Sequence, residues 1–349
     1  MRQKDKVTIY DISKKLNISA ATVSRALNNS DRVSQKTLDL VLKTAKELNY
    51  QQNTLALALK SGRTNNVGVV VPYINHNFFA SVIRGIEEEL TPVGYHVIIC
   101  QTHENVENEI RQIQTLLNTH IDGIFMSVSK STQDTSHIKS VLDDGVPLIF
   151  FDRKKDVPGV SSVTINDFQG GFLATDHLIK QGCKRIAHLS GDLNLEIYLK
   201  RYEGYLEALR VNNIPVDDNL ILEVNSKLES GAAAAKKLWA LPKKIDAIFS
   251  SSDYAALGAI QQLKLMQVGI PDEVSVAGFS NEPFTQYMEL PITSIDQTPV
   301  LMGKIAAQVF LEQIKEKREM TVEKKVVLTP ELHVRDSSKR STVKSNQPL

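Results

Sequence analysis

The sequence predicts a small all-α N-terminal unit followed by a larger two-lobed α/β unit with doubly wound parallel sheets. Residues 1–52 contain short amphipathic helical patterns separated by turns. From residue 65, apolar strand patterns alternate with amphipathic helices, which is typical of parallel sheets with crossover helices. The alternation restarts near residue 161, and two lobes explain a chain of 349 residues better than one sheet of about a dozen strands.

Composition excludes several classes of protein. No apolar run approaches the length of a transmembrane helix, so no membrane partner is expected, and residues 1–15 lack the apolar core of a secretory signal. Cys100 and Cys183 are too few for a disulfide framework, so reduced thiols in the cytoplasm are expected. The eight histidines show no metal-binding spacing, so no metal is expected.

Charge is unevenly distributed along the chain. Residues 1–63 carry 12 Lys and Arg against 5 Asp and Glu, a net charge of +7, whereas the remaining 286 residues carry 29 against 35, a net charge of −6. A basic end on an acidic body predicts a polyanionic partner for that end. A basic N-terminus that is merely solvated is the alternative.

Three helices are expected in the N-terminal unit. Thr8, Ser19 and Ser34 are residue types that cap helix N-termini, Asp11 can complete a capping box with Thr8, and Asn17 can end the first helix. The residues expected to face inward are Ile9, Ile12 and Leu16, then Val23, Ala26 and Leu27, then Leu38, Val41, Leu42, Ala45 and Leu48. The tight turn between the first two helices makes a helix-turn-helix pattern.

The second helix of this pattern exposes small and polar residues where Lys and Glu would be usual. They are Ser19, Ala20, Ala21, Thr22, Ser24 and Arg25. Small residues let a helix backbone approach a major groove, hydroxyl groups reach phosphates and base edges, and Arg binds guanine or phosphate. An ordinary three-helix bundle with a small exposed face is the alternative.

Residues 53–64, NTLALALKSGRT, form a short apolar segment and a polar joint. So short a helix is not stable alone in water, and Leu55, Leu57 and Leu59 are costly to expose together. The segment is expected to fold on meeting DNA or a second copy, with Leu59 entering a base step from the minor groove. A linker helix packed on the body is an equal alternative.

The segments VTIYDISKKLNISAATVSRALN, RVSQKTLDLVLKTAKELNY and NTLALALKSGRT together resemble the headpiece and hinge of the lactose/galactose repressor family of bacterial transcription regulators. The resemblance implies a DNA-binding headpiece over 1–52 and a hinge helix and linker over 53–64. Gln52 and Leu57 depart from the Pro and Arg that are frequent in the family, which implies a looser hinge with fewer phosphate contacts.

The family's DNA contacts carry over by position. Ala20, Ala21 and Arg25 would read bases, and Leu59, with Ala56 in the same segment, would form the minor-groove wedge. The residues that would hold the DNA backbone are Thr8, Tyr10, Ser19, Thr22, Ser24, Asn28, Arg32, Ser34, Tyr50 and Asn53.

Polar residues follow three of the predicted strands in the body. They are Asp152 with Arg153, Ser252 with Asp253, and Ser280 with Asn281 and Glu282. A polar residue at a strand end is usually a cap or turn former. Because ligands of open parallel sheets bind beyond the carboxyl ends of the strands, several such residues together favour a binding site.

Residues 67–335 resemble the family's regulatory domain, which is related to periplasmic sugar-binding proteins. The effector-binding and dimerisation domain would cover 65–335, with a first lobe at about 65–164 and 296–325 and a second at about 165–295 and 326–335. The residues that would face the effector are Phe78, Phe79, Asp152, Arg153, Asn166, Asp167, Arg201, Ser252, Asp253, Ser280, Asn281 and Gln297. Residues 324–335 are interpreted as a pair of strands, and the polar residues 336–349 are expected to be disordered.

The chemistry of this set suits a sugar. Carboxylates and guanidinium groups bind paired hydroxyls, and aromatic rings cover an apolar sugar face. Ser226 and Ser280 stand where relatives often have an aromatic residue and Asp, which weakens the expectation of ring stacking and of one carboxylate. Arg153 and Arg201 could equally favour a sugar acid.

The sequence contains no nucleotide-binding glycine signature and no G-x-S-x-G elbow, so no cofactor and no enzyme activity are expected. The resulting prediction is a cytoplasmic, homodimeric repressor that binds near-palindromic operator DNA under control of a sugar-like effector. The alternative is a small-ligand-binding protein of the periplasmic type without a DNA function. The helix-turn-helix pattern and the absence of a signal peptide favour the regulator.

Overall fold

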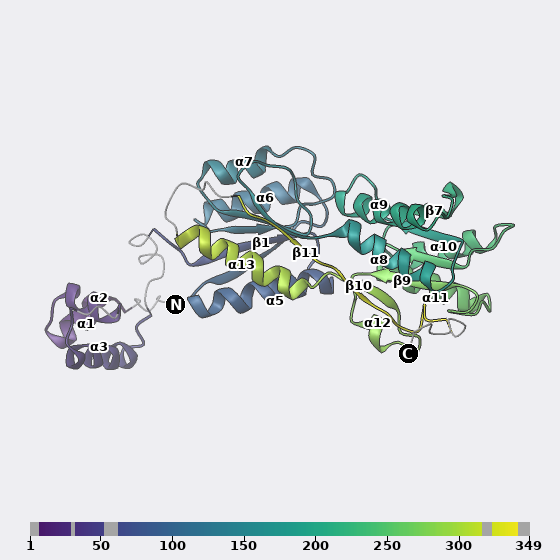
Figure 1. Ribbon diagram of the computed structural model, residues 1–349. Coiled ribbons are helices and arrows are strands. Elements are labelled where there is room, and N and C mark those ends of the chain that lie inside the picture. Colours follow the sequence, from purple (N-terminus) through teal and green to yellow (C-terminus); the bar gives the residue numbers. More distant parts are fainter. Residues whose placement is uncertain (1–6, 29–31, 52–61, 316–322, 341–349) are drawn as a thin grey trace, which may run out of the picture. The chain divides into compact units, whose positions relative to one another are not determined.

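The computed structural model describes residues 7–28, 32–51, 62–315 and 323–340 (Figure 1). The chain divides between Thr64 and Asn65 into two compact units. The first is helical and the second is a two-lobed α/β unit, as the sequence predicts. Among the described residues, no helix combines the length and the apolar character that a membrane span requires.

The first unit, the headpiece, contains α1 (Ile9–Leu16), α2 (Ala20–Leu27) and α3 (Gln35–Glu47). The predicted caps are confirmed. The Asp11 carboxylate accepts the N–H and the hydroxyl of Thr8, both at 2.8 Å. Ser19 and Ser34 accept the backbone N–H three residues ahead, at 3.1 and 3.3 Å. Asn17 ends α1 with a left-handed φ of 51°.

The headpiece core confirms most of the predicted inward residues but not Leu42. Val41 and Ala45 are buried, whereas Leu42 is 46% exposed and Thr44, at 3%, is buried instead. Positions three and four apart share a helix face, so the inward face runs through Leu38, Val41 and Ala45. Leu42 follows Val41 directly and turns out of that face.

The first lobe is built on a six-stranded, all-parallel sheet in the order β11-β5-β4-β3-β1-β2. Its strands are β1 (Asn66–Val71), β2 (His96–Gln101), β3 (Ile124–Met126), β4 (Leu148–Phe151), β5 (Ser161–Ile165) and β11 (Lys325–Leu328). Its helices are α5 (Asn77–Leu90), α6 (Val106–Asn118), α7 (Ser136–Asp143) and α13 (Pro299–Lys315), with a 3-10 turn, η1, at Thr91–Val93.

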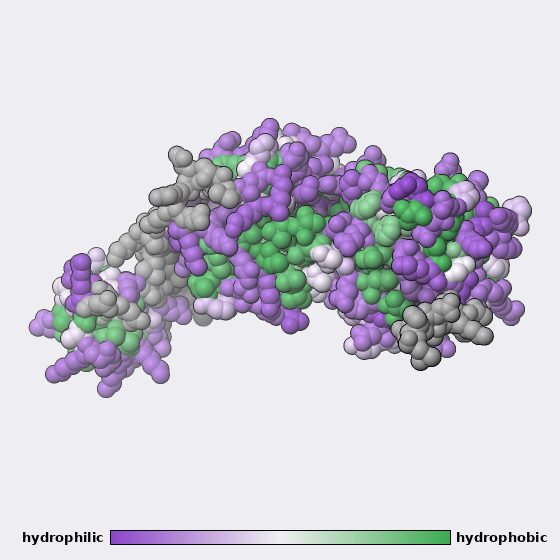
Figure 2. Space-filling model, in the orientation of Figure 1, coloured by the Kyte–Doolittle hydropathy of each residue, from purple (hydrophilic) through white to green (hydrophobic). Residues whose placement is uncertain are grey.

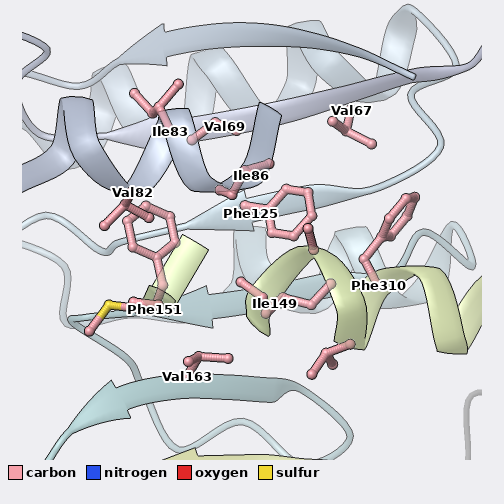
Figure 3. Packing of buried hydrophobic residues seen from close by; sticks show 14 of the residues in the cluster. Val67, Val69, Val82, Ile83, Ile86, Phe125, Ile149, Phe151, Val163 and Phe310 are labelled. Atoms are coloured by element: carbon pink, nitrogen blue, oxygen red, sulfur yellow. The ribbon is translucent and has the colours of Figure 1, made fainter. Parts of the chain in front are cut away.

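Helices cover both faces of this sheet. α5 and α13 share one apolar core with β1, β3 and β4, whereas α6 and α7 belong to a second core on the other face. Figure 3 shows Val82 and Ile86 of α5 and Phe310 of α13 over Phe125 and Ile149 of the sheet. The two helices touch backbone to backbone, since a Cβ on Gly303 would lie 2.1 Å from the Val82 carbonyl oxygen.

The second lobe has a six-stranded sheet in the order β12-β10-β9-β8-β6-β7, in which β12 is antiparallel to β10. Its strands are β6 (Ile186–Ser190), β7 (Ile221–Glu223), β8 (Ala247–Ser250), β9 (Ser275–Phe279), β10 (Thr293–Asp296) and β12 (Glu331–His333). Its helices are α8 (Asp167–Lys180), α9 (Glu196–Val211), α10 (Leu228–Trp239), α11 (Asp253–Leu265) and α12 (Phe284–Tyr287), with a 3-10 turn, η2, at Asp218–Leu220. α8 and α9 pack on one face and α10 and α11 on the other.

Three segments connect the lobes. The third, which joins β11 to β12, shows that the prediction of a strand pair over 324–335 is wrong. β11 pairs in parallel with β5 of the first lobe, and β12 pairs with β10 of the second lobe. The chain therefore crosses at Thr329 and Pro330 rather than between residues 325 and 326. Proline has no N–H to continue a strand ladder, which suits the crossing point. Asp296, which ends β10, also belongs to the second lobe rather than the first.

The prediction of a disordered tail is wrong for residues 336–340. Ser337 and Ser338 are fully buried. The Ser337 carbonyl accepts the Val276 N–H at 2.8 Å, and the Arg340 guanidinium donates to the Asp246 carbonyl at 2.7 Å. These polar residues satisfy backbone groups of the second lobe, so a polar composition here indicates hydrogen bonding rather than disorder. Residues 341–349 lie outside the described part of the chain.

Candidate functional site

A cavity of about 1000 Å³ is lined by residues of both lobes. Nine predicted effector residues line it, namely Phe78, Phe79, Asp152, Arg153, Arg201, Ser252, Asp253, Ser280 and Gln297. Most follow the carboxyl ends of strands, so the strand-end rule located the cavity. A volume of this order accommodates a small molecule of one or two rings with water.

Three predicted residues, Asn166, Asp167 and Asn281, are not among the residues that line the cavity. The Asn166 side chain caps α8 by accepting the Gln169 N–H at 3.0 Å. The Asn281 amide donates to Asp296 at 2.8 Å and accepts from Arg335 at 2.7 Å. Their polar groups are occupied in holding the fold behind the cavity wall.

Asp167 does not line the cavity itself but is bound to Arg201, which does. Arg201, on α9, is 3% exposed, and its Nε donates to Asp167 Oδ1 at 2.7 Å while its Nη1 donates to the Ser251 carbonyl at 3.0 Å. The guanidinium lies 3.6 Å above the Phe279 ring. Burial raises the pKa of Asp167 to about 6, although Arg201 opposes the shift. The pair fixes the guanidinium at the cavity wall.

A second guanidinium lines the cavity from the first lobe. Arg153 Nη1 contacts both oxygens of Glu104, at 2.8 and 3.0 Å, and its Nε lies 3.9 Å from Asp152 Oδ2. Burial opposes the charge of Arg153, but the Glu104 and Asp152 carboxylates outweigh it and raise the pKa of Arg153. Burial also raises the pKa of Asp152, against the influence of Arg153 and Arg201. Both arginines of the cavity thus already have a carboxylate partner.

Acidic groups gather on the second lobe's side of the cavity. Asp253 is fully buried and accepts from Ser294 Oγ at 2.7 Å and from the Glu282 N–H at 2.8 Å. Burial raises the pKa of Asp253 to about 6, which these hydrogen bonds oppose. Glu282 lines the cavity beside it and has a pKa raised to about 7, by burial first and by the Asp253 charge second.

Several lining residues were not in the predicted set. Among them are Tyr73 and His76 from the loop after β1, Glu104 after β2, Lys130 after β3, Asp192 after β6, and Asn225 and Ser226 after β7. Each follows a strand, so the strand-end rule would have found them if applied to every strand. Glu282 was noticed by that rule but was absent from the family-derived set.

The headpiece presents the predicted small face. Ala21 and Arg25 of α2 are exposed, and Val23 and Ala26 are buried against the other helices. Tyr10 is 71% exposed. The exposed or partly exposed set also includes Thr8, Ser19, Ala20, Thr22, Ser24, Asn28, Arg32, Ser34 and Tyr50. Asn53, Ala56 and Leu59, with the hinge prediction that rests on them, lie outside the described residues.

Comparison with known proteins decides the family. Residues 64–332 match the model of periplasmic binding proteins and the sugar-binding domain of the LacI family, and residues 8–53 match that of bacterial regulatory proteins of the lacI family. The first match alone spans more than half of the chain. The chain belongs to the lacI family of bacterial regulatory proteins.

Relatives in the lacI family match the chain along nearly its whole length. The regulator DegA of Bacillus subtilis is 31% identical over 95% of this chain and 98% of its own, and the repressor PurR of Vibrio parahaemolyticus is 32% identical over 95% and 99%. A solved structure of the regulator CelR with cellobiose is 29% identical, with a TM-score of 0.71 over 95% of this chain and 100% of its own.

Membership in the lacI family explains the order of the two units. A helix-turn-helix headpiece precedes a regulatory α/β unit, and the chain is a DNA-binding transcriptional regulator of this family. The reading of the chain as a sugar-binding protein without a DNA function is thereby rejected, since it leaves residues 8–53 without a role.

Proposed function

We propose that this lacI-family regulator is a repressor that binds a near-palindromic operator as a homodimer, and that a sugar-like effector in the cavity between the lobes controls this binding. The observation that carries the proposal is the pairing, in one chain, of a small-faced α2 with a cavity that is lined from two lobes by polar and aromatic residues. A helix-turn-helix dimer binds two half-sites about one helical turn apart, which accounts for the near-palindrome.

On the DNA side, α2 is the proposed recognition helix. Its exposed positions carry Ala20, Ala21 and Arg25, which we propose contact base edges, and Ser19, Thr22 and Ser24 are placed to hold phosphates. The predicted contacts of the rest of the headpiece and of Asn53 with the DNA backbone belong to the same proposed interface. The minor-groove wedge of Leu59 with Ala56 in the hinge completes it.

On the effector side, the hydrogen-bonding groups around the cavity favour a hydroxyl-rich ligand. Phe78, Phe79 and Tyr254 supply rings, and Asp152, Ser252 and Gln297 supply polar groups. Arg153 and Arg201 are each paired with a carboxylate of the chain, but Arg153 Nε is buried without a hydrogen-bond partner among the described residues. The pairing alone therefore leaves both a neutral sugar and a sugar acid open. The cellobiose complex of the relative CelR also supports a sugar.

For the homodimer, we propose contact through exposed apolar residues of both lobes. On the first lobe, Ile98 and Ile99 of the edge strand β2 are 37% and 50% exposed, and Leu301 of α13 is 47% exposed. Figure 2 shows apolar residues gathered on that lobe where α5 and α13 lie in Figure 1. On the second lobe, Leu265 and Tyr287 are about 80% exposed. Such residues suit an interface with a second copy.

We further propose that the protein acts without catalysis and in the cytoplasm. The cavity carboxyls of Asp152 and Asp253 accept hydrogen bonds from serines of the chain, and their proposed role is to bind the effector. The proposed partner is chromosomal DNA, which places the action in the cytoplasm.

The proposed DNA function is tested by selecting binding sites from a random duplex pool with the full-length protein. A near-palindromic sequence should be enriched, and its affinity should fall steeply with salt, as expected when basic side chains displace counterions from phosphates. Failure to enrich any sequence would favour a ligand-binding protein without a DNA function.

A further inference from the structure

One buried carboxyl group that lines the cavity, that of Glu282, receives no side-chain hydrogen bond from the described residues. Glu282 is 6% exposed. Its backbone N–H and carbonyl bond to Asp253 and Thr285, but no described residue donates to its side-chain oxygens. The Glu282 oxygens are not among the fully buried, unpartnered side-chain atoms of the described residues, so they open onto the cavity. A ligand that displaces water from the cavity must therefore supply a donor to this carboxyl.

No cation among the described residues forms an ion pair with the Glu282 carboxyl. Arg153 is bound by Glu104 and Arg201 by Asp167. Lys130 and Lys227 line the cavity but are exposed. The charge that acts on Glu282 is the like charge of Asp253, which adds to burial in raising the pKa of Glu282.

An aromatic residue, Tyr254, follows Asp253 directly in the sequence and also lines the cavity. Its ring lies 5.0 Å from that of Phe284. Burial first, and then the charges of Glu282 and Asp253, raise the pKa of Tyr254. Carboxylates beside an aromatic ring make a favourable environment for an ammonium group.

We propose that Glu282, Asp253 and Tyr254 form a subsite for a protonated amine, and that the effector is an amine-bearing sugar. The inference rests on the proposed role of the cavity as the effector site. An ammonium group gives Glu282 its missing donors and opposes two neighbouring negative charges. A neutral hydroxyl leaves the charge of Glu282 without an opposite charge, and a sugar acid brings a further carboxylate beside Glu282 and Asp253.

The test compares matched sugars on the full-length protein by calorimetry at pH 7. The pairs are D-glucosamine with D-glucose, D-galactosamine with D-galactose, and the glucosamine disaccharide with cellobiose, and D-glucuronate represents sugar acids. At least one amine is expected to bind about tenfold or more tighter than its hydroxyl counterpart, as a charge-assisted hydrogen bond implies. If the tightest binder is neutral or acidic, or if no amine binds, the proposal is wrong.

Glu282→Gln isolates the carboxyl, and Glu289→Gln removes the same charge from an exposed site whose side chain is 93% exposed. The amine preference should fall to about twofold or less in the first variant and persist in the second. Binding of the amine at pH 7 should release a proton from Glu282, seen as a heat that depends on the buffer, and this release should disappear in Glu282→Gln. A preference that survives Glu282→Gln would overturn the assignment.

The two proposals fail in different ways. If a neutral sugar binds more tightly than every amine of the panel and changes operator affinity, the effector function stands and the amine subsite is wrong. If an operator is selected but no sugar of the panel binds, the amine subsite is again wrong while DNA binding stands.

Discussion

At the scale of single residues, the cavity depends on buried charges that the chain itself neutralises. Arg201 is held by Asp167, by the Ser251 carbonyl and by the Phe279 ring, so its guanidinium is fixed before any ligand arrives. A ligand that meets preorganised groups loses less free energy to ordering. The same burial makes each of these groups costly to remove.

Removal of Arg201 should destabilise the α/β unit more than removal of the whole pair. Arg201→Ala leaves Asp167 buried without a partner and should lower the free energy of unfolding by about 3–5 kcal/mol. Arg201→Ala combined with Asp167→Asn should recover at least about 1 kcal/mol of that loss. Urea unfolding of both variants measures the difference. Equal losses would mean that the two side chains are not energetically coupled.

Glu282 should make stability fall as pH rises. Its pKa is about 7 in the folded protein against 4.5 for an ordinary glutamate, so the protonated form is favoured by folding. This contribution is complete below pH 4.5 and is lost as pH rises through 7. Glu282→Gln should therefore raise the free energy of unfolding at pH 8 by on the order of 1–3 kcal/mol, which raises Tm by a few degrees. At pH 4.5 the substitution should change Tm little. A Tm difference independent of pH would contradict the assigned pKa.

At the scale of elements, α2 is short and depends on its cap and on neighbouring helices for its shape. Ser19 provides the cap, and Val23 and Ala26 lie in the headpiece core. Its exposed face is thereby left free to carry small residues, because the cap and the core contacts stabilise the helix. The function of α2 and its stability are therefore separable by mutation.

Ala21→Asp should abolish operator binding without unfolding the headpiece. Ala21 is exposed, so an added carboxylate costs little stability but would face phosphates at close range. An affinity loss of about a hundredfold or more is expected in anisotropy titrations with the selected operator. Asn49→Asp adds the same charge at an exposed position outside the predicted contact set and should bind nearly normally. Comparable losses in the two variants would indicate a general charge effect rather than a recognition helix.

Elements whose signals are local could be predicted, and those set by long-range pairing could not. Thr8, Ser19 and Asn17 predict helix ends correctly, because a helix cap depends only on residues that are close in sequence. Residues 325–333 look like a strand pair, yet β11 and β12 lie in different sheets because their partners are distant in sequence. The strand-end rule found the cavity but does not give side-chain direction, so Asn281, which the rule selected, is not among the residues that line it. Asn166, which was carried over by position from the family, does not line it either.

At the scale of the whole molecule, three connections join lobes that share a cavity. An exposed ion pair, Lys154 with Glu196 at 3.1 Å, also links the first lobe to the second. A ligand bound to both lobes can alter their relative angle, because a two-lobed unit joined by short segments closes by hinge motion. We propose that this change is transmitted to the DNA-binding units of a dimer.

The proposed dimer face should be sensitive to charge. Ile98→Lys with Ile99→Lys would bury two ammonium groups if a second copy packs against the edge strand β2, so dimers should dissociate at micromolar protein. Val211→Lys with Val216→Lys changes residues that are 46% and 48% exposed on the second lobe and should leave the mass unchanged. Sedimentation equilibrium distinguishes the two. A mass unaffected by the β2 substitutions would place the dimer contact elsewhere.

Transmission from the cavity to the DNA is tested by measuring the affinity of the full-length protein for its selected operator, with and without the sugar that binds most tightly in the matched panel. This sugar is expected to change operator affinity by about 5-fold or more, the usual size of coupling between two sites. Identical affinity with and without a saturating concentration of the bound sugar would contradict this transmission.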